Sequence, residues 1–369
     1  MRQSFSIPPA RRYAVRAGVK RLLGTTAVLL LGACAAPSSD PIPPSPPQVA
    51  TGHIRVMSAN ALNLFSTVDA GDNRCGPDAD ACRGADSAAE FERQLAKLVT
   101  TIRLSGADIV ALMEVENDTG ETLATLAAAV TKATEGSWES IDTGVVGRGP
   151  IKVGFIYNSA RVSVQGEPRV LDARIDPRFN DDKNRPSVAQ AFKALDERGA
   201  AGVTVIANHF KSKGSNCDAL GDPDLGDGQG NCNLTRTRAA AALSAWAATD
   251  PLDTDGDVLI VGDLNAYLGE DPVTELETSG YVNLLTEFIG DDAWTYEYRG
   301  RRGALDHAFA TPKLAERITR VAAWHINAGR SRDLDYNLDG DRDPALFDAN
   351  SPVRSSDHDP LVIDLRARR

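Results

Sequence analysis

Short apolar runs separated by polar segments recur along the chain from residue 54 onward. Their length and their content of branched apolar residues are typical of buried β-strands. Two neighbouring runs, 151–157 and 161–164, are spaced like a hairpin, and 188–195 and 203–208 like a second pair. The pattern predicts strands over 54–60, 108–113, 151–157, 161–164, 188–195, 203–208, 258–261, 304–310, 318–326 and 361–365.

Three segments instead show the features of helices. Residues 87–104 repeat apolar side chains at intervals of three and four, which places them on one helix face. Residues 119–133 and 235–249 are rich in alanine, a strong helix former. No repeat of fixed period and no long linker interrupts this series. It therefore predicts one layered α/β domain, with a mixed, largely antiparallel sheet system covered by helices.

The first residues have the features of an export signal. A basic segment is followed by an apolar run over 22–31, which is too short to span a bilayer. Leu31-Gly32-Ala33-Cys34 resembles the lipobox of bacterial lipoproteins, with Cys34 as the lipidated residue; ordinary signal-peptidase cleavage is the alternative. We predict a signal peptide with lipobox over 1–34, a Pro/Ser-rich linker over 35–51, and the folded domain over 52–369.

The residue after the predicted lipidation site bears on localisation. It is Ala35 and not aspartate, which by resemblance to enterobacterial sorting favours the outer membrane. We therefore expect an exported protein, an outer-membrane lipoprotein or a cell-surface or extracellular form, held by a lipid on Cys34. The sequence identifies no protein partner.

Composition narrows the class of protein. Hydrophobic residues make up 42% and charged residues 25% of the chain, as in soluble globular proteins. The net charge of −11 excludes a passive nucleic-acid coat, which needs a basic field. Besides Cys34, the four cysteines are Cys75, Cys82, Cys217 and Cys232. In an exported chain they predict two disulfides, of three connectivities, with sequence-local pairing the simplest. Their spacing argues against a zinc site.

Polar residues of a particular kind follow the apolar runs. His358 lies between Asp357 and Asp359, just before the last run, and carboxylates raise the basicity of a histidine. Strand ends that meet at one sheet edge form a crevice where ligands bind. Carboxylates and amides suit Mg²⁺, and histidines suit proton transfer. This pattern favours metal-assisted attack of water on a phosphate. The residues are Asn60, Glu114, His209, Asp263, Asn265, Asp306 and His358.

Nine segments carry a resemblance to a known family. Over residues 52–366 the chain resembles the endonuclease/exonuclease/phosphatase superfamily, and within it the bacterial extracellular nucleases of the deoxyribonuclease-like branch. The segments, in the family's order, are MSANALNLF (57–65), DIVALMEVEND (108–118), IKVGFIYNSARVSV (151–164), NRPSVAQAF (184–192), VIANHFKSKGSNC (205–217), GDGQGNCNLTRTRAA (226–240), VGDLNAY (261–267), GALDHAFAT (303–311) and SSDHDPLVIDL (355–365).

The resemblance implies a fold and an activity. The fold is a four-layered α/β sandwich, two packed mixed β-sheets flanked by helices, with the site at one edge of the sheets. The activity is Mg²⁺-dependent phosphodiester hydrolysis, with Mn²⁺ as an alternative ion, by an exported nuclease acting on extracellular DNA or on RNA. Endonucleolytic and exonucleolytic cutting both stay open.

The resemblance also assigns roles to residues. It implies that His358 is the general base, oriented by Asp306, and that His209 is a general acid. The implied metal ligands are Glu114 and Asp357, and the implied phosphate ligands are Asn60 and Arg185. Asp263 and Asn265 would position the phosphate and the attacking water.

One departure from the family pattern affects His209. Relatives carry an acid just before the strand at 151, where this chain has Gly147-Arg148-Gly149-Pro150. The sequence therefore offers no partner for His209, and a structural histidine is the alternative reading. Lys211 and Lys213 either meet substrate phosphates or are merely solvated. Tyr296 and Tyr298 either stack on bases or are buried sheet aromatics, the reading we favour.

Two alternatives to a nuclease stay open. One is a sphingomyelinase-like enzyme or a phosphatase on the same scaffold. The other is a non-catalytic Ca²⁺-binding surface protein, since residues 335–341 resemble the start of a calcium loop and 222–227 are also acidic. Position 12 of that loop is Leu346 and not glutamate, which argues against an EF-hand but leaves a structural Ca²⁺ site open.

Overall fold

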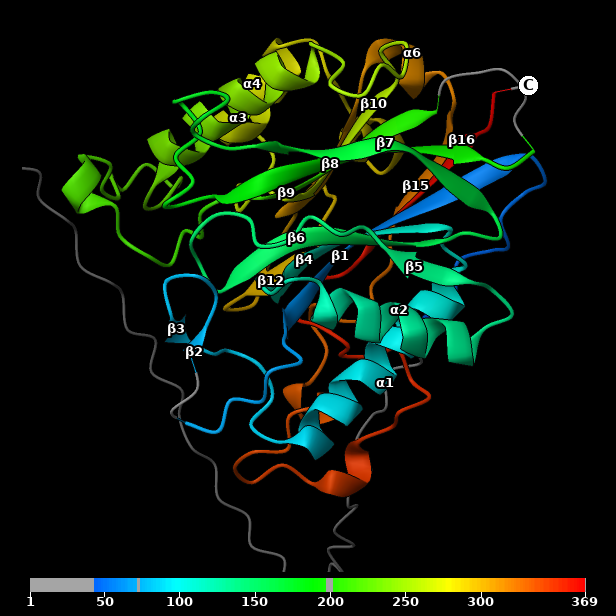
Figure 1. The fold of residues 1–369 in the computed structure, drawn as a ribbon. Coiled ribbons are helices and arrows are strands. Elements are labelled where there is room, and N and C mark those ends of the chain that lie inside the picture. Colours follow the sequence, from blue (N-terminus) through cyan, green and yellow to red (C-terminus); the bar gives the residue numbers. More distant parts are fainter. Residues whose placement is uncertain (1–42, 72–73, 197–201, 369) are drawn as a thin grey trace, which may run out of the picture. The chain divides into compact units, whose positions relative to one another are not determined.

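The computed structural model describes residues 43–71, 74–196 and 202–368. Two six-stranded sheets form its centre (Figure 1). The first has the order β15-β16-β1-β4-β6-β5 and the second β11-β14-β10-β9-β8-β7. Their strands are β1 (His53–Leu64), β4 (Ile109–Glu116), β5 (Trp138–Ser140), β6 (Ile151–Asn158), β7 (Val162–Leu171), β8 (Arg185–Ala194), β9 (Val203–His209), β10 (Val258–Asp263), β11 (Val282–Asn283), β14 (Asp306–Ala310), β15 (Ile318–Ala323) and β16 (Leu361–Arg366).

Helices cover the outer faces of both sheets. The helices are α1 (Ala88–Ser105), α2 (Glu121–Ala133), α3 (Asn233–Ala247), α4 (Asp271–Thr278), α5 (Leu284–Phe288) and α6 (Pro312–Ala315), with 3₁₀ turns at Asp218–Leu220, Arg332–Leu334 and Pro344–Leu346. Two short ribbons, β2 (Arg74–Cys75) with β3 (Asp80–Ala81) and β12 (Tyr296–Tyr298) with β13 (Arg301–Gly303), lie outside the sheets.

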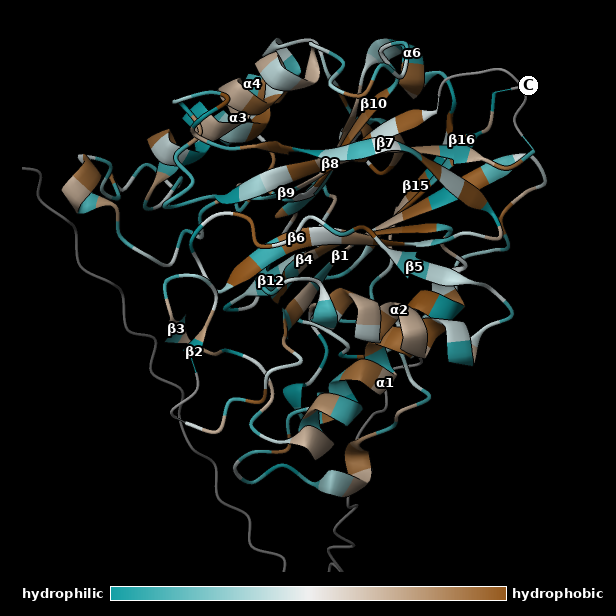
Figure 2. Cartoon of the chain, viewed as in Figure 1, coloured by the Kyte–Doolittle hydropathy of each residue, from teal (hydrophilic) through white to brown (hydrophobic). Residues whose placement is uncertain are grey.

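Apolar side chains join these layers. One core cluster lies between the sheets and contains Phe155 of the first sheet and Phe192 of the second, whose rings meet edge to face. A second cluster packs α1 and α2 on the first sheet, and a third packs α3 and α4 on the other. The strands are correspondingly apolar along much of their length (Figure 2). The predicted four-layered α/β sandwich is confirmed.

The predicted helices and most predicted strands are confirmed to within a few residues. Helix α1 begins at Ser87, whose hydroxyl accepts from the backbone N–H of Glu90 and satisfies one of the free donors of the first turn. The cysteines pair locally, Cys75 with Cys82 and Cys217 with Cys232. The simplest of the three connectivities is therefore present.

The predicted hairpin over 151–164 is wrong. β6 pairs with β4 and β5 in the first sheet, whereas β7 pairs with β8 in the second. The chain crosses from one sheet to the other between these two strands. β6 is buried almost throughout, while β7 alternates buried and exposed residues as an edge strand does. Periodicity shows that both are strands but does not show which strands they pair with.

Close contact between two central strands requires a glycine. Gly262 of β10 has φ 136°, and a Cβ there would lie 2.1 Å from the carbonyl oxygen of Asn208. Asn208 is in β9, the parallel neighbour of β10. A side chain at position 262 would therefore force these two strands apart.

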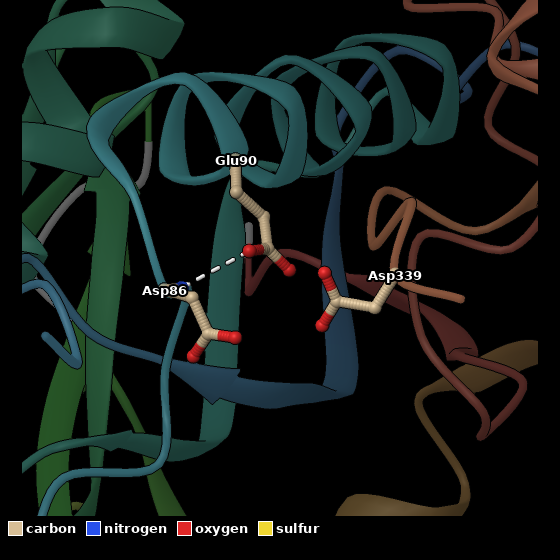
Figure 3. A group of neighbouring side chains, drawn as sticks. All are labelled: Asp86, Glu90 and Asp339. Atoms are coloured by element: carbon tan, nitrogen blue, oxygen red, sulfur yellow. Dashed lines mark hydrogen bonds between the residues drawn. The ribbon is translucent and has the colours of Figure 1, made fainter. Parts of the chain in front are cut away.

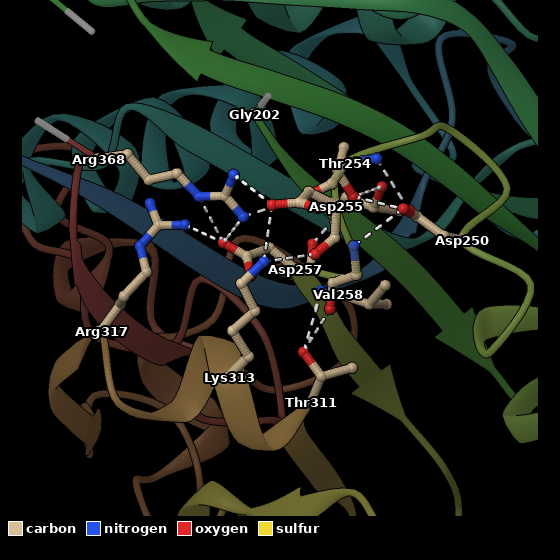
Figure 4. A network of polar contacts seen from close by, with 12 residues as sticks. Gly202, Asp250, Thr254, Asp255, Asp257, Val258, Thr311, Lys313, Arg317 and Arg368 are labelled. Carbon is tan, nitrogen blue, oxygen red and sulfur yellow. Dashed lines mark hydrogen bonds and ion pairs between the residues drawn. The ribbon is translucent and has the colours of Figure 1, made fainter. Parts of the chain in front are cut away.

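An ion network lies where strand β10 begins (Figure 4). Asp257, just before the strand, has a fully buried carboxylate that pairs with Arg317 and lies 2.6 Å from Nη2 of Arg368. Nearby Asp255 pairs with Lys313 at 2.8 Å and with Arg368 at 3.3 Å. Each carboxylate there has at least two cationic partners.

The leader and the linker were predicted over 1–34 and 35–51. Residues 1–42 lie outside the described part of the chain. Residues 43–50 contain no helix or strand, and the backbone oxygen of Pro44 accepts from the indole N–H of Trp324 at 3.1 Å. Within 43–71, 74–196 and 202–368, no helix combines the length and apolar content needed to cross a bilayer.

Candidate active site

Three strands bring polar residues to one edge of the second sheet. His209 ends β9 and Asp263 ends the parallel strand β10, while Asp306 begins the antiparallel strand β14. In the register, Asp263 is opposite both His209 and Asp306. The sequence prediction placed Asp306 at a strand end, whereas it lies at a strand start. Because β14 runs the other way, its start meets the ends of β9 and β10.

His358 is held against this edge by Asp306. It lies in the loop before β16, and its Nδ1 is 2.8 Å from Oδ2 of Asp306. Because Nδ1 donates to the carboxylate, Nε2 is the nitrogen left to exchange a proton, and it lies 4.0 Å from Oδ2 of Asp263. The ring of Tyr296 packs against the imidazole, with 4.5 Å between ring centroids. The predicted pairing of His358 with Asp306 is thus present.

Neighbouring carboxylates govern the proton affinity of His358. Burial alone lowers its pKa, but the charges of Asp306 and then Asp263 outweigh burial. The pKa of His358 consequently lies well above its ordinary value of 6.5. The histidine is a strong base once deprotonated, and it stays protonated over a wider pH range than an isolated histidine.

His209 has the opposite electrostatic setting. Its imidazole is buried, with Nε2 3.6 Å from Asp263 and 3.9 Å from Glu114, and its Nδ1 has no hydrogen-bond partner among the described residues. Burial, and then the positive charge of Arg185, lower the pKa of His209 well below 6.5. It is therefore neutral in the absence of substrate, which disfavours a standing general acid. The two carboxylates are its nearest acidic neighbours, and neither is within hydrogen-bond distance.

Burial also perturbs Asp263. Its carboxylate is buried beside Asp306 and Glu114, and burial raises the pKa of Asp263 above its ordinary value while the charge of His358 lowers it. Oδ1 accepts the backbone N–H of Asn265 at 2.8 Å. Several acidic groups are therefore buried together in this centre, as is common in functional sites.

The sequence predicted that Glu114 follows a strand, but Glu114 lies within one. β4 continues to Glu116, and its pairing with β1 and β6 is irregular at Glu114, whose φ is 59°. Such a bulge inserts a residue and redirects its side chain. Oε2 of Glu114 accepts the backbone N–H of Asn63 at 3.1 Å. The side chain is 19% exposed, and its Oε1 lies 3.9 Å from Nε2 of His209.

Asn60 precedes a matching irregularity in β1. Its Oδ1 accepts the backbone N–H of Leu62 at 2.9 Å, which fixes the amide orientation. Its Nδ2 is buried and has no hydrogen-bond partner within the described residues. A free buried donor is costly unless a ligand satisfies it. It matches the phosphate contact predicted for Asn60.

Asn265 and Arg185 share an anchor. Nδ2 of Asn265 donates to the backbone oxygen of Phe210 at 3.1 Å, and Nη1 of Arg185 donates to the same oxygen at 3.3 Å. Arg185 starts β8 opposite His209 in the register. Burial lowers the pKa of Arg185, and the charges of Glu114 and Asp263 act against that shift. Both predicted residues therefore belong to the same edge.

The donor set fits a hard divalent cation. The predicted ligands Glu114 and Asp357 offer carboxylate oxygens, the type that Mg²⁺ prefers. Asp357 lines a cavity of about 300 Å³ together with Tyr296, and its charge raises the pKa of the neighbouring His358. The assignment of these two residues as a metal pair stays a prediction.

The two acidic loops, 335–341 and 222–227, have different surroundings. Asp339, from the calcium-like segment 335–341, lies beside Asp86 and Glu90 of the α1 region, with oxygens within 4.8 Å (Figure 3). Glu90 also accepts the backbone N–H of Asp86 at 3.0 Å. In the other loop, Asp222 accepts from the backbone N–H groups of Leu234 and Thr235. Asp222 is therefore occupied at the start of α3.

Several residues left open by the sequence now have defined surroundings. His307 is buried, with Nε2 2.7 Å from the backbone oxygen of Ala266. Tyr298 is 54% exposed, so the reading of it as a buried sheet aromatic is wrong; it lies on a two-stranded ribbon with one open face. Nδ1 of His325 lies 2.9 Å from Oδ2 of Asp359.

Thr295 is a positioning residue that the sequence did not reveal. Its hydroxyl accepts the backbone N–H groups of Leu305 and Asp306, each at 3.1 Å, and so fixes the start of β14. A single buried threonine before a short ribbon carries no distinctive pattern in the sequence. Only the contact across ten or more residues identifies it.

The profile of the Endonuclease/Exonuclease/phosphatase family matches residues 57–358. The chain therefore belongs to this family, whose members are phosphoester hydrolases that commonly use divalent metals, and it is a hydrolase of that family. None of the curated proteins matches it.

Three solved structures share the fold, each at 13% identity. A family protein from Bacteroides thetaiotaomicron has a TM-score of 0.54 and covers 86% of this chain and 98% of its own. A mannosyl-6-phosphatase from the same organism has a TM-score of 0.53, with 84% and 98% covered. ANGEL2, a 2′,3′-cyclic phosphatase in complex with adenosine-2′,3′-vanadate, has a TM-score of 0.51, with 85% and 96% covered.

Proposed function

We propose that this protein is a Mg²⁺-dependent phosphodiesterase, a nuclease of the deoxyribonuclease-like branch that hydrolyses extracellular DNA or RNA. The observation that carries the proposal is the buried His358–Asp306 pair, whose free Nε2 faces Asp263 at the sheet edge. Arg185 lies opposite His209 in the strand register, and Asn60 lies opposite Met113, next to Glu114. The amide Nδ2 of Asn60 has no hydrogen-bond partner among the described residues. A base, phosphate ligands and acidic groups from separate strands are what the proposed reaction requires.

In the proposed reaction, Nε2 of His358 takes a proton from water as the water oxygen bonds to phosphorus. Asp306 stabilises the imidazolium that forms. Nδ2 of Asn60 and the guanidinium of Arg185 hold the phosphate oxygens, where negative charge builds up. A divalent ion bound at Glu114 and Asp357 would neutralise part of that charge.

The bond from phosphorus to the leaving oxygen then breaks, and that oxygen needs a proton. His209 can supply it only if the negative charge of bound substrate raises its depressed pKa. In its neutral form, His209 instead donates a hydrogen bond to a phosphate oxygen, and a water molecule supplies the proton to the leaving oxygen. We keep both roles for His209, and its pKa favours the second.

We also propose that the protein is exported and anchored by a lipid on Cys34, at the outer membrane or cell surface. Two disulfides in the described chain support an oxidising compartment. Labelling cells with a clickable fatty acid tests the anchor, with Cys34→Ser as the variant that loses the label.

A phosphatase or a sphingomyelinase-like enzyme is the main rival. The fold does not separate these substrates, because one structure of similar fold is described as a mannosyl-6-phosphatase. A parallel assay on circular DNA, linear DNA, RNA, sphingomyelin and a phosphomonoester decides among them. Mg²⁺, Mn²⁺ and Ca²⁺ are added singly after treatment with EDTA. Turnover only of the monoester or of sphingomyelin overturns the nuclease.

The decisive variant is His358→Ala. We expect it to lose on the order of 10²–10⁴-fold in phosphodiester hydrolysis because the base is removed. The variant should still fold, which its circular dichroism spectrum checks. His53→Ala is the matched control and should keep full activity, since His53 lines a hollow with Arg317 and Arg366 that contains none of the predicted site residues. Full activity in His358→Ala contradicts the assignment, whereas stability lost on EDTA addition without any turnover supports a non-catalytic Ca²⁺-binding protein.

A further inference from the structure

A charged hollow lies beside the candidate active site. Its volume is about 180 Å³, room for about six waters at roughly 30 Å³ each. Four segments line it: the Cys75–Cys82 loop region, residues 146–151, residues 181–186 and Lys211. Arg185 belongs to the lining, and its charge environment includes Glu114 and Asp263. The hollow and the catalytic centre therefore share a wall.

Three cations of this hollow have no side-chain partner among the described residues. Arg83, Lys183 and Lys211 line it, and their side chains form no hydrogen bond or ion pair with any described residue. Arg83 follows Cys82 directly, so the Cys75–Cys82 disulfide ties its segment in place. The backbone N–H of Lys211 donates to Asn184 at 3.0 Å, which fixes this residue after β9. The backbone at these positions is therefore held in place, whereas the side-chain charges have no partner among the described residues.

Other cations nearby are already engaged. Lys213, two residues after Lys211, pairs with Glu270 and lies over the ring of Tyr267. Arg148, also in the lining, pairs with Asp78 at 2.9 Å and lies 3.9 Å from Asp182. The two lysines that the sequence treated alike thus differ: Lys213 is structural, and Lys211 is free for a ligand.

The unpaired cations repel one another. The pKa of Lys211 falls to about 8, first because of burial and then because of Arg185, Lys183 and Arg83. The lining also holds Asp80, Asp181 and Asp182, of which Asp182 faces Arg148. The lining holds five cationic and three acidic side chains, so the hollow is positive although the chain has a net charge of −11, and a positive hollow next to the site attracts an anion.

We propose that Arg83, Lys183 and Lys211 hold a second phosphate of the substrate, next to the one that is cleaved. The proposal rests on the proposed function and deepens it. Arg185 lies between the two phosphates, and the preferred substrate is a polynucleotide whose backbone continues into the hollow. A substrate with a single phosphate leaves the three cations unsatisfied.

The test compares a long and a short substrate. The variant is Arg83→Gln combined with Lys183→Gln, assayed on a single-stranded oligonucleotide and on bis(p-nitrophenyl) phosphate, which has one phosphate. We expect KM for the oligonucleotide to rise about tenfold or more, and a much smaller change on the small diester. The slope of log KM against log salt should also weaken by about 1 per lost phosphate contact.

The control is Arg74→Gln. Arg74 lies in the same disulfide-bonded segment and is exposed, but it does not line the hollow. Combined with Lys132→Gln on the exposed surface of α2, it removes the same two charges and should leave KM and the salt slope as in the wild type. Equal losses in the control and the double variant mean that only overall charge matters, and this outcome overturns the inference.

Two further outcomes are distinct. If the double variant matches the wild type on the oligonucleotide, the second phosphate subsite is wrong while the nuclease assignment stands. If the wild type cleaves neither substrate with any of the three divalent ions, the proposed function fails and the inference fails with it. Binding of an uncleaved oligonucleotide in EDTA, followed by fluorescence anisotropy, gives a readout of the same contacts without turnover.

Discussion

Each end of strand β10 has a buried aspartate, and the charged groups around the two aspartates differ. At the Val258 end, the buried carboxylate of Asp257 is surrounded by Arg317, Arg368 and Lys313 (Figure 4). At the other end, Asp263 is buried beside Asp306 and Glu114, with two histidines as its basic neighbours. One end is neutralised by the chain itself, and the other is not.

The difference separates a structural ion network from a candidate functional one. Paired buried charges stabilise a fold, or at least cost nothing further, because each charge has a partner. Unpaired carboxylates and free donors destabilise the fold on their own, and they become favourable only when a ligand arrives. The number of acidic residues in a segment therefore does not distinguish a structural site from a functional one. The charges around each acidic residue do.

The largest expected effect comes from breaking the pair at the Asp263 end. Asp306→Asn removes the carboxylate that orients His358, and we expect hydrolysis to fall by about 10²–10⁴-fold. The measurement is kcat/KM on a phosphodiester, with Asp339→Asn, an acid outside this edge, as control. Wild-type activity in Asp306→Asn contradicts the pairing.

The same variant changes the pH profile in a defined direction. His358 acts as a base only when it is deprotonated, so wild-type activity is lost as pH falls through its raised pKa. Below that pKa the rate drops about tenfold per pH unit. Asp306→Asn removes the largest of the charges that raise this pKa, so its acid limb moves to lower pH although its maximum rate is smaller. An unshifted limb shows that another group controls the profile.

A second comparison applies one substitution to both ends of the strand. Asp257→Asn removes a fully buried carboxylate that pairs with the partly exposed Arg317 and Arg368, and we expect a loss of about 1.5–3 kcal/mol in unfolding free energy. Asp263→Asn removes a carboxylate whose burial is unfavourable, so stability should stay level or rise while hydrolysis is lost. Chemical denaturation and activity of both variants test this. Equal destabilisation of the two removes the distinction between the ends.

The smallest effect is expected at the rim of the ion network. The side chain of Lys313 is 54% exposed, and exposed ion pairs contribute about 0–1 kcal/mol. Lys313→Gln should therefore change the melting temperature slightly and activity not at all. Lys132→Gln, on exposed α2 surface, is the control. A loss as large as that of Asp257→Asn shows that Lys313, and not Arg317 and Arg368, stabilises the network.

Local sequence patterns were sufficient to predict individual helices and strands. The apolar spacing of residues 87–104 predicted α1, and the run before Gly262 predicted β10, because amphipathic periodicity follows from each element's own geometry. The nine segments in family order were enough for the four-layered fold. They were also enough to place His209, Asp263 and His358 at one edge, since sheet register brings strand ends together.

Other features depended on contacts between distant segments. The pairing of β6 and β7 with different sheets, the bulge at Glu114 and the hydroxyl of Thr295 beneath Asp306 have no local pattern. The same holds for Lys211 and Lys213, whose different roles follow from Glu270, a residue far along the chain.

The sequence by itself therefore determined the elements, the family and the chemical types at the site. Only the tertiary structure decided which charges are neutralised and which are left for a ligand. The physical reason is that burial and Coulomb interactions depend on distance in space, and residues far apart in the chain set both. His209 and His358 are the same residue type at the same edge, and their pKa values shift in opposite directions.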